Sequence, residues 1–219
     1  KPSDMSDYTY ENYDAICRIN TDAAAVTVNA KWAADNGITD LATFVDYCKA
    51  HPGEVKMGGS SAGSVWHIAG GYLMNAADID IKMITYADGA AGAVKAAAQQ
   101  EIEGVTVSLA EARSFIESGD LICLGVMSDT PVDGINFPTF AEQGYDKVVS
   151  TKKYEVKFPK GVDQAIVDKL AAACKEVVES DSFAETLKKF YAEPLWRDAD
   201  TMNKEDPEEV EALKAGLAE

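Results

Sequence analysis

The sequence lacks any apolar stretch that approaches the roughly 20 residues of a membrane-spanning helix. It is also poor in basic residues, since 20 Lys and Arg stand against 37 Asp and Glu and give a formal net charge of −17. Such a charge repels phosphate backbones, and no basic, aromatic-rich segment is present, so no nucleic-acid partner is expected. The 219 residues, 47% of them apolar, suffice for one sizeable domain or two small ones.

Histidine and cysteine are scarce and scattered. The two histidines are His51 and His67. The four cysteines lie far apart in apolar runs and form no Cys-x-x-Cys pair; they are Cys17, Cys48, Cys123 and Cys174. We therefore expect no metal site and no cofactor, and we interpret the cysteines as buried free thiols.

Strand-like and helix-like segments alternate through the middle of the chain. Thr39 or Asp40 is expected to cap a first helix, which His51-Pro52-Gly53 ends. The alternation that follows predicts parallel βαβ units with helices on both faces of a sheet. The predicted strands are 55–58, 81–86, 105–107 and 121–127, and the predicted helices are 64–77, 89–100 and 109–118.

The two ends of the chain have a different character. Residues 15–28 form a β-like run that begins abruptly. After Tyr154 we expect helices, one introduced by 159–163 and one capped by Asp181-Ser182. A further helix is expected to begin at Asp206-Pro207, with its acidic run, residues 205–211, on an exposed face.

Three of the predicted strands end in loops that lead directly into helices. The first loop is rich in Gly and Ser and covers residues 58–64, the second covers 86–90, and the third is at Ser108. In a parallel sheet these loops reach one edge, where ligands bind. Helix N-termini offer free N–H groups and positive partial charge, so this edge suits a small carboxylate.

The same loop residues also have a purely structural interpretation. Ser61 or Ser64 is expected to cap the first of these helices and Asp88 the second, while Ser108 and Glu111 form a capping box for the third. Ordinary α/β turns contain such residues without binding a ligand. Both interpretations stay open on the residues alone.

Catalysis has weaker support. Ser61, His67 and Asp88 could be combined into a nucleophilic triad, but the Gly-x-Ser-x-Gly signature is absent, and a histidine on a helix face more simply packs there. Arg113, in the helix after Ser108, could reach an anion, although a solvated helix arginine is the default. We assign no catalytic residue.

A set of motifs, specific in its order and spacing, resembles a known family. The motifs are Asp40-Leu41 through Ala50-His51-Pro52-Gly53, the loop Gly58 to His67, Tyr86-Ala87-Asp88-Gly89-Ala90, Ile116-Glu117-Ser118-Gly119, Phe137 to Tyr145, and Pro159-Lys160-Gly161-Val162. They are similar to those of the extracytoplasmic solute-binding receptors of tripartite tricarboxylate transporters, the TctC or Bug family.

The resemblance implies a type II periplasmic-binding-protein-like fold. This is an α/β fold with a parallel-rich sheet flanked by helices and, here, a partial second domain. Residues 1–28 would be a remnant of domain 1, 29–153 the ligand-binding domain 2, and 154–219 the C-terminal helical part of domain 1. Family members usually carry a longer N-terminal stretch, so we expect that part of domain 1 is lacking and that unpaired sheet edges favour dimerisation or strand exchange.

The resemblance also implies which residues contact the ligand. Carried over by position, these are Ser60, Ser61, Ala62, Gly63, Ser64, Tyr86, Ala87, Asp88, Gly89, Ala90 and Ser108. The family more often has a Tyr-Lys-Gly-Gly-like turn where this chain has Asp88. A carboxylate there penalises a multiply charged anion, so we expect a mono- or dicarboxylate, amino acids included, rather than citrate.

The expected function is non-enzymatic capture of a small organic carboxylate and its delivery to a membrane permease. The expected location, from the resemblance, is periplasmic or otherwise extracytoplasmic. Two alternatives remain open at this point. A ligand-sensing regulatory domain of the same fold would need a DNA-binding helix-turn-helix, which this chain lacks. An enzyme built on the same sheet would need a convergent acid, base or nucleophile.

Overall fold

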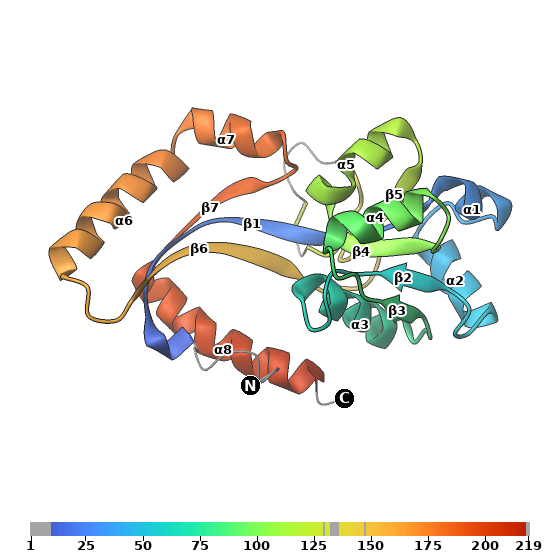
Figure 1. The fold of residues 1–219 in the computed structure, drawn as a ribbon, viewed down its shortest axis with the longest axis horizontal. Helices are drawn as coiled ribbons and strands as arrows, with labels where there is room; N and C mark the ends of the chain where they lie inside the picture. Colours follow the sequence, from blue (N-terminus) through green and yellow to red (C-terminus); the bar gives the residue numbers. More distant parts are fainter. Residues whose placement is uncertain (1–9, 129, 132–135, 147, 218–219) are drawn as a thin grey trace. The chain divides into compact units, whose positions relative to one another are not determined.

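The computed structural model describes residues 10–128, 130–131, 136–146 and 148–217, and the chain divides into two compact units (Figure 1). Unit 1 combines residues 1–21 with 153–219, and unit 2 is the continuous stretch 22–152. Strand β1 (Tyr13–Asn29) is 17 residues long and contributes its first part to unit 1 and its last part to unit 2. Residues 22–28 thus belong to unit 2, whereas the resemblance grouped them with residues 1–21 as a remnant of domain 1.

Unit 2 is built on a sheet with the strand order β3-β2-β4-β1-β5. Strand β2 (Lys56–Gly58) is parallel to β3 (Lys82–Ile84) and to β4 (Gly104–Ser108). Strand β1 lies between β4 and β5 (Leu121–Val126) and is antiparallel to both, so β4 and β5 run in the same direction. The four strands that alternate with helices therefore share one direction, as predicted, and β1 is inserted against them.

Local capping residues fix where the helices of unit 2 begin. Asp40 forms a capping box with Thr43, and Ser64 caps the next predicted helix. Gly119, with φ 82°, ends the last of them in the left-handed conformation that glycine tolerates best. The helices are α1 (Ala30–Asp35), which was not predicted, and α2 (Leu41–Ala50), α3 (Val65–Ala77), α4 (Ala90–Ala98) and α5 (Leu109–Ser118).

Helices α3 and α4 cover opposite faces of this sheet (Figure 1). The hydroxyl of Thr106 donates to the carbonyl oxygen of Trp66 at 2.8 Å, which holds the first turn of α3 over one face of β4. Neighbouring residues of a strand point to opposite faces. On the other face a Cβ on Gly58 would come within 2.9 Å of the Cβ of Ala93, so the glycine lets α4 approach closely. Fully buried side chains fill both layers, among them Val26, Leu41, Phe44, Met57 and Leu73.

Among the described residues, unit 1 adds two further strands and three α-helices to the first part of β1. Strand β1 pairs with β6 (Thr151–Pro159) and, antiparallel, with β7 (Glu193–Asp198). Both strands fall where mainly helices were predicted. The helices α6 (Gln164–Val178), α7 (Asp181–Lys188) and α8 (Ala199–Leu217) each contact β7.

The last helix begins earlier than predicted. Helix α8 begins at Ala199, because Oδ1 of Asp198 accepts the N–H of Thr201 at 2.9 Å and caps the first turn. Pro207 lies inside the helix and not at its first position, so the prediction that the helix begins there is wrong. Among the residues described, no helix combines the length and the apolar composition needed to cross a bilayer.

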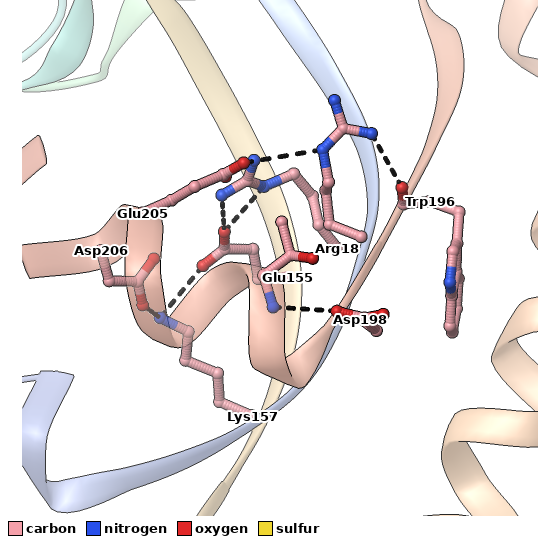
Figure 2. A network of polar contacts seen from close by, with 9 residues as sticks. Arg18, Glu155, Lys157, Trp196, Asp198, Glu205 and Asp206 are labelled. Atoms are coloured by element: carbon pink, nitrogen blue, oxygen red, sulfur yellow. Dashed lines mark hydrogen bonds and ion pairs between the residues drawn. The ribbon is translucent and has the colours of Figure 1, made fainter. Parts of the chain in front are cut away.

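Unit 1 buries a network of charges that joins β1, β6 and α8 (Figure 2). Arg18 is 3% exposed; its Nε donates to Oε1 of Glu155 at 2.9 Å and its Nη1 to Oε2 of Glu205 at 2.6 Å. Nζ of Lys157 lies 3.1 Å from Oε2 of Glu155 and 2.6 Å from Oδ2 of Asp206. Burial lowers the pKa of Arg18 and of Lys157, but the hydrogen bonds to these carboxylates outweigh it and raise both pKa values.

This network corrects one interpretation of the sequence. Glu205 and Asp206 belong to the acidic run that was expected on an exposed face. Both are half-buried, and both are paired with cations from strands far away in the sequence. For these two residues the expectation of a solvated face is wrong.

Candidate functional site

The first two predicted loops meet at one edge of the sheet of unit 2. The N–H of Gly59 donates to the carbonyl oxygen of Ile84 at 3.0 Å, and the N–H of Tyr86 donates to that of Ser60 at 3.3 Å. A Cβ on Gly89 would lie 3.7 Å from Oγ of Ser60, so this hydroxyl lies beside the start of α4. The loops 58–64 and 86–90 therefore form one surface, which we call the paired loops.

The tip of the first paired loop is open to solvent. Ser61, Ala62 and Gly63 are exposed, while Ser60 and Ser64 are half-buried. Oγ of Ser64 accepts the N–H of His67 at 3.3 Å and so caps α3, as predicted. Because the exposed side chains are small, the tip presents backbone amides and a serine hydroxyl to solvent.

The second paired loop differs from its prediction. Helix α4 begins after Gly89, whose φ of 81° turns the chain into the helix, and no side chain caps it. The prediction that Asp88 caps α4 is wrong. Its exposed carboxylate instead lies against Gly92, in the first turn of the helix. Burial raises the pKa of the half-buried Tyr86, and the charges of Glu101 and Asp88 raise it further.

The third loop reaches the same edge but is closed to solvent. Ser108 is 1% exposed and forms the predicted capping box: its Oγ accepts the N–H of Glu111 at 3.2 Å, and its own N–H donates to Oε2 of Glu111 at 3.3 Å. Burial raises the pKa of the Asp22 carboxyl group, and the neighbouring Ser108 side chain lowers it. A ligand contact by Ser108 stays a prediction, since its hydroxyl is buried and already caps α5.

Asp22 is a candidate residue that the sequence patterns did not reveal. In the antiparallel pairing Ala24 lies opposite Ser108, which places Asp22 at the edge where β4 ends. Asp22 is 8% exposed, and burial raises its pKa to about 7; the Ser108 side chain and the charge of Lys152 lower this pKa, and the charge of Glu111 raises it. In the sequence, an aspartate inside a β-like run was the available signal for this site. Its position at this edge depends on the antiparallel pairing of β1 with β4.

The residues considered for catalysis do not assemble. Nδ1 of His67 accepts the N–H of Gly63 at 3.3 Å, and in the described part of the chain no hydrogen bond links this ring to Ser61 or Asp88. Arg113 pairs with Glu117 one turn along α5, with Nε 2.7 Å from Oε1. No group of three or more His, Cys, Asp or Glu side chains among the described residues could hold a metal ion.

Comparison with known proteins gives one consistent family. The family model for the tripartite tricarboxylate transporter family receptor, TctC, matches residues 4–216. Protein BugT of Bordetella pertussis is 30% identical over 165 residues, which make up 72% of this chain and 48% of BugT. The chain spans about half the length of the curated relatives it matches, 55% of one and 48% of the other.

Solved structures agree on the fold. A ligand-free TctC solute-binding protein from Polaromonas is 26% identical, with a TM-score of 0.77 over 98% of this chain and 72% of that one. The structure of R. palustris Rpa4515 with adipate is 21% identical, with a TM-score of 0.81 over 96% of this chain and 67% of that one. The α/β fold is thus periplasmic-binding-protein-like, with a sheet flanked by helices, and the family and fold are those of solute-binding proteins. With a family model that covers nearly its whole length, the chain belongs to the TctC family of tripartite tricarboxylate transporter receptors.

Proposed function

We propose that this chain is part of an extracytoplasmic receptor that captures a small organic carboxylate at the paired loops and delivers it to a membrane permease of the tripartite type. Membership of the TctC family supports the receptor role and the permease partner. The R. palustris relative with adipate supports a dicarboxylate ligand. The proposal covers the whole receptor, of which this chain is about half by the measure of its curated relatives.

The observation that carries the proposal is the pair of helix N-termini at the paired loops. Helix α4 begins without a side-chain cap, and the loop into α3 exposes small residues only, Ser61, Ala62 and Gly63. The first N–H groups of a helix have no partner within the helix, and they carry the positive end of its dipole. Such groups recognise a carboxylate without Lys or Arg, which suits a chain with few cations.

A ligand screen tests the proposal first. We expect at least one of adipate, succinate, glutamate and citrate to raise the melting temperature of the purified protein, because a ligand that binds only the folded state stabilises it by mass action. Isothermal titration calorimetry then gives the affinity and stoichiometry. No shift with any of the four at millimolar concentration contradicts the proposal for this chain.

Ser61→Glu is expected to weaken binding of the best of these ligands about tenfold or more. The new carboxylate would lie at the exposed tip of the first paired loop, and two like charges about 4 Å apart repel by roughly 1 to 4 kcal/mol near a protein surface. The matched control is Ser182→Glu, since Ser182 is exposed in the first turn of α7 in unit 1. Equal affinities of the two variants in calorimetry would place the ligand elsewhere.

Asp88→Asn is expected to strengthen binding, and more for citrate than for glutamate. Removing the carboxylate from the first turn of α4 removes a repulsion that grows with ligand charge, about threefold to tenfold in affinity per nearby carboxylate. Asp80→Asn, an exposed position just before β3 and at the opposite end of that strand, serves as the control. If Asp88→Asn leaves both the order of ligands and their affinities unchanged, Asp88 does not select the ligand.

A further inference from the structure

Two of the four cysteines meet inside unit 1. Cys17 lies in β1 and is fully buried, and Cys174 lies in α6 and is half-buried. Cys17 is paired in register with Asp198 of β7, against which α6 packs, so the layer between α6 and these strands holds both residues. Besides burial, the nearby Cys174 thiol raises the pKa of Cys17, so the two thiols are neighbours. Strand β1 and helix α6, far apart in the sequence, therefore bring two sulfur atoms together.

The other two cysteines have no such neighbour. Cys48 is fully buried in α2, and Cys123 in β5 donates its thiol hydrogen to the carbonyl oxygen of Gly125 at 3.7 Å. Both belong to unit 2, and burial raises the pKa of each to about 12. Thiols of this kind react slowly, because the thiolate is the nucleophile. They provide an internal reference for the pair in unit 1.

We infer that Cys17 and Cys174 form a disulfide when the protein meets a disulfide oxidant, such as oxidised glutathione or a protein disulfide. The half-buried Cys174 is the accessible partner, so its thiolate attacks one sulfur of the oxidant and releases one glutathione thiolate. The Cys17 thiolate then attacks the Cys174 sulfur of this mixed disulfide and releases the second glutathione. Two protein thiols are oxidised, one glutathione disulfide is reduced, and the two protons pass to the released glutathiones.

The burial of Cys17 limits the rate of this reaction. Burial and the neighbouring Cys174 thiol raise the pKa of Cys17 to about 12, so little thiolate is present at neutral pH. The second step is therefore expected to be the slow one, and to become faster as the pH rises. An extracytoplasmic location, which the family supports, provides an oxidising environment in which such a disulfide persists.

The disulfide has a mechanical consequence within unit 1. It would join β1, from the beginning of the chain, to α6, from its last third. A cross-link over a long loop reduces the freedom of the unfolded chain, and we expect the melting transition of unit 1 to rise by about 5–15 °C on oxidation. The inference does not depend on the identity of the ligand.

Thiol counting on the intact protein tests the inference. The purified protein is reduced, freed of reductant, incubated with oxidised glutathione, quenched in acid, and alkylated with iodoacetamide under denaturing conditions. We expect four adducts by mass spectrometry before oxidation and two after it, together with the loss of two hydrogens, and peptide mapping should link the peptides of Cys17 and Cys174. The Cys48→Ala Cys123→Ala double variant should form the same link, and Cys174→Ala should not.

Three outcomes would overturn the inference. The four thiols could remain free when the redox buffer has reached equilibrium. Glutathione could stay attached to Cys174 without being displaced by Cys17. The peptide map could link a different pair. The wild-type measurement decides among these by itself, so the test does not depend on a cysteine variant that folds.

Discussion

Arg18→Met is expected to lower the free energy of unfolding of unit 1 by about 3–5 kcal/mol. The guanidinium group is almost completely buried and faces Glu155 and Glu205 (Figure 2). Without it, Glu155, whose side chain is 14% exposed, keeps its contact with Lys157, and Glu205 keeps a longer contact with Arg197, 3.6 Å between Nε and Oε1. Removing one partner of a buried ion pair leaves an uncompensated charge, and this costs far more than the pair itself contributes.

The measurement has to report on unit 1 separately from unit 2. Hydrogen exchange followed by mass spectrometry reports β1, β6 and β7 peptide by peptide. The matched control is Arg113→Met, because Arg113 pairs with Glu117 on the surface of α5 and such a pair contributes about 0.5 kcal/mol or less. Similar exchange in β6 and β7 for both variants would mean that the charge network of unit 1 does not stabilise it.

Asp22→Asn is expected to stabilise unit 2 at about pH 8.5 by about 2–4 kcal/mol and to have little effect near pH 4. The carboxyl group has an ordinary pKa of 3.8, and burial raises it to about 7 in the folded protein. Between these values the folded protein binds more protons than the unfolded chain, so stability falls as the pH rises from 3.8 through 7. The shift of this pKa from 3.8 to about 7 corresponds to a loss of at most about 4 kcal/mol of folding stability at high pH. Asparagine stays neutral, so the Asp22→Asn variant does not lose this stability.

Chemical denaturation of both proteins between about pH 4 and pH 8.5 measures this effect. Asp46→Asn is the control, because Asp46 is exposed on α2 and its replacement should change stability by less than about 0.5 kcal/mol at every pH. A difference between wild type and Asp22→Asn that does not grow with pH would show that Asp22 stays charged. Calorimetry at the same pH values shows whether its charge also changes carboxylate affinity at the neighbouring paired loops.

The parts of unit 2 that depend on near neighbours follow from the sequence. Ser64, Ser108 with Glu111, and Gly119 cap their helices as predicted, because capping involves residues only three or four positions apart. Asp88 is the exception. It carries the right residue type for a cap, but the positive φ of Gly89 moves the start of α4 one residue beyond it.

Long-range pairing explains what the sequence did not reveal. Whether β1 is parallel or antiparallel to β4 depends on contacts between segments about 80 positions apart. Only the antiparallel pairing places Asp22 beside Ser108. The cations that neutralise Glu205 and Asp206 likewise come from distant strands, so a local acidic run resembles a solvated face. The capping carboxylate of Asp198 also starts α8 well before the proline that suggested a later start.

The path of β1 through both units has a consequence for biosynthesis. Unit 2 is one continuous stretch, and a ribosome completes it before it makes β6 beyond residue 152, β7 or the helices of unit 1. The first part of β1, which contains Cys17 and Arg18, is therefore synthesised before the strands and helices that it contacts in unit 1. During that interval its strand edges are unpaired and its arginine has no buried carboxylates beside it. In a nascent chain, this segment therefore stays without its unit 1 partners until β6, β7 and α8 have been made.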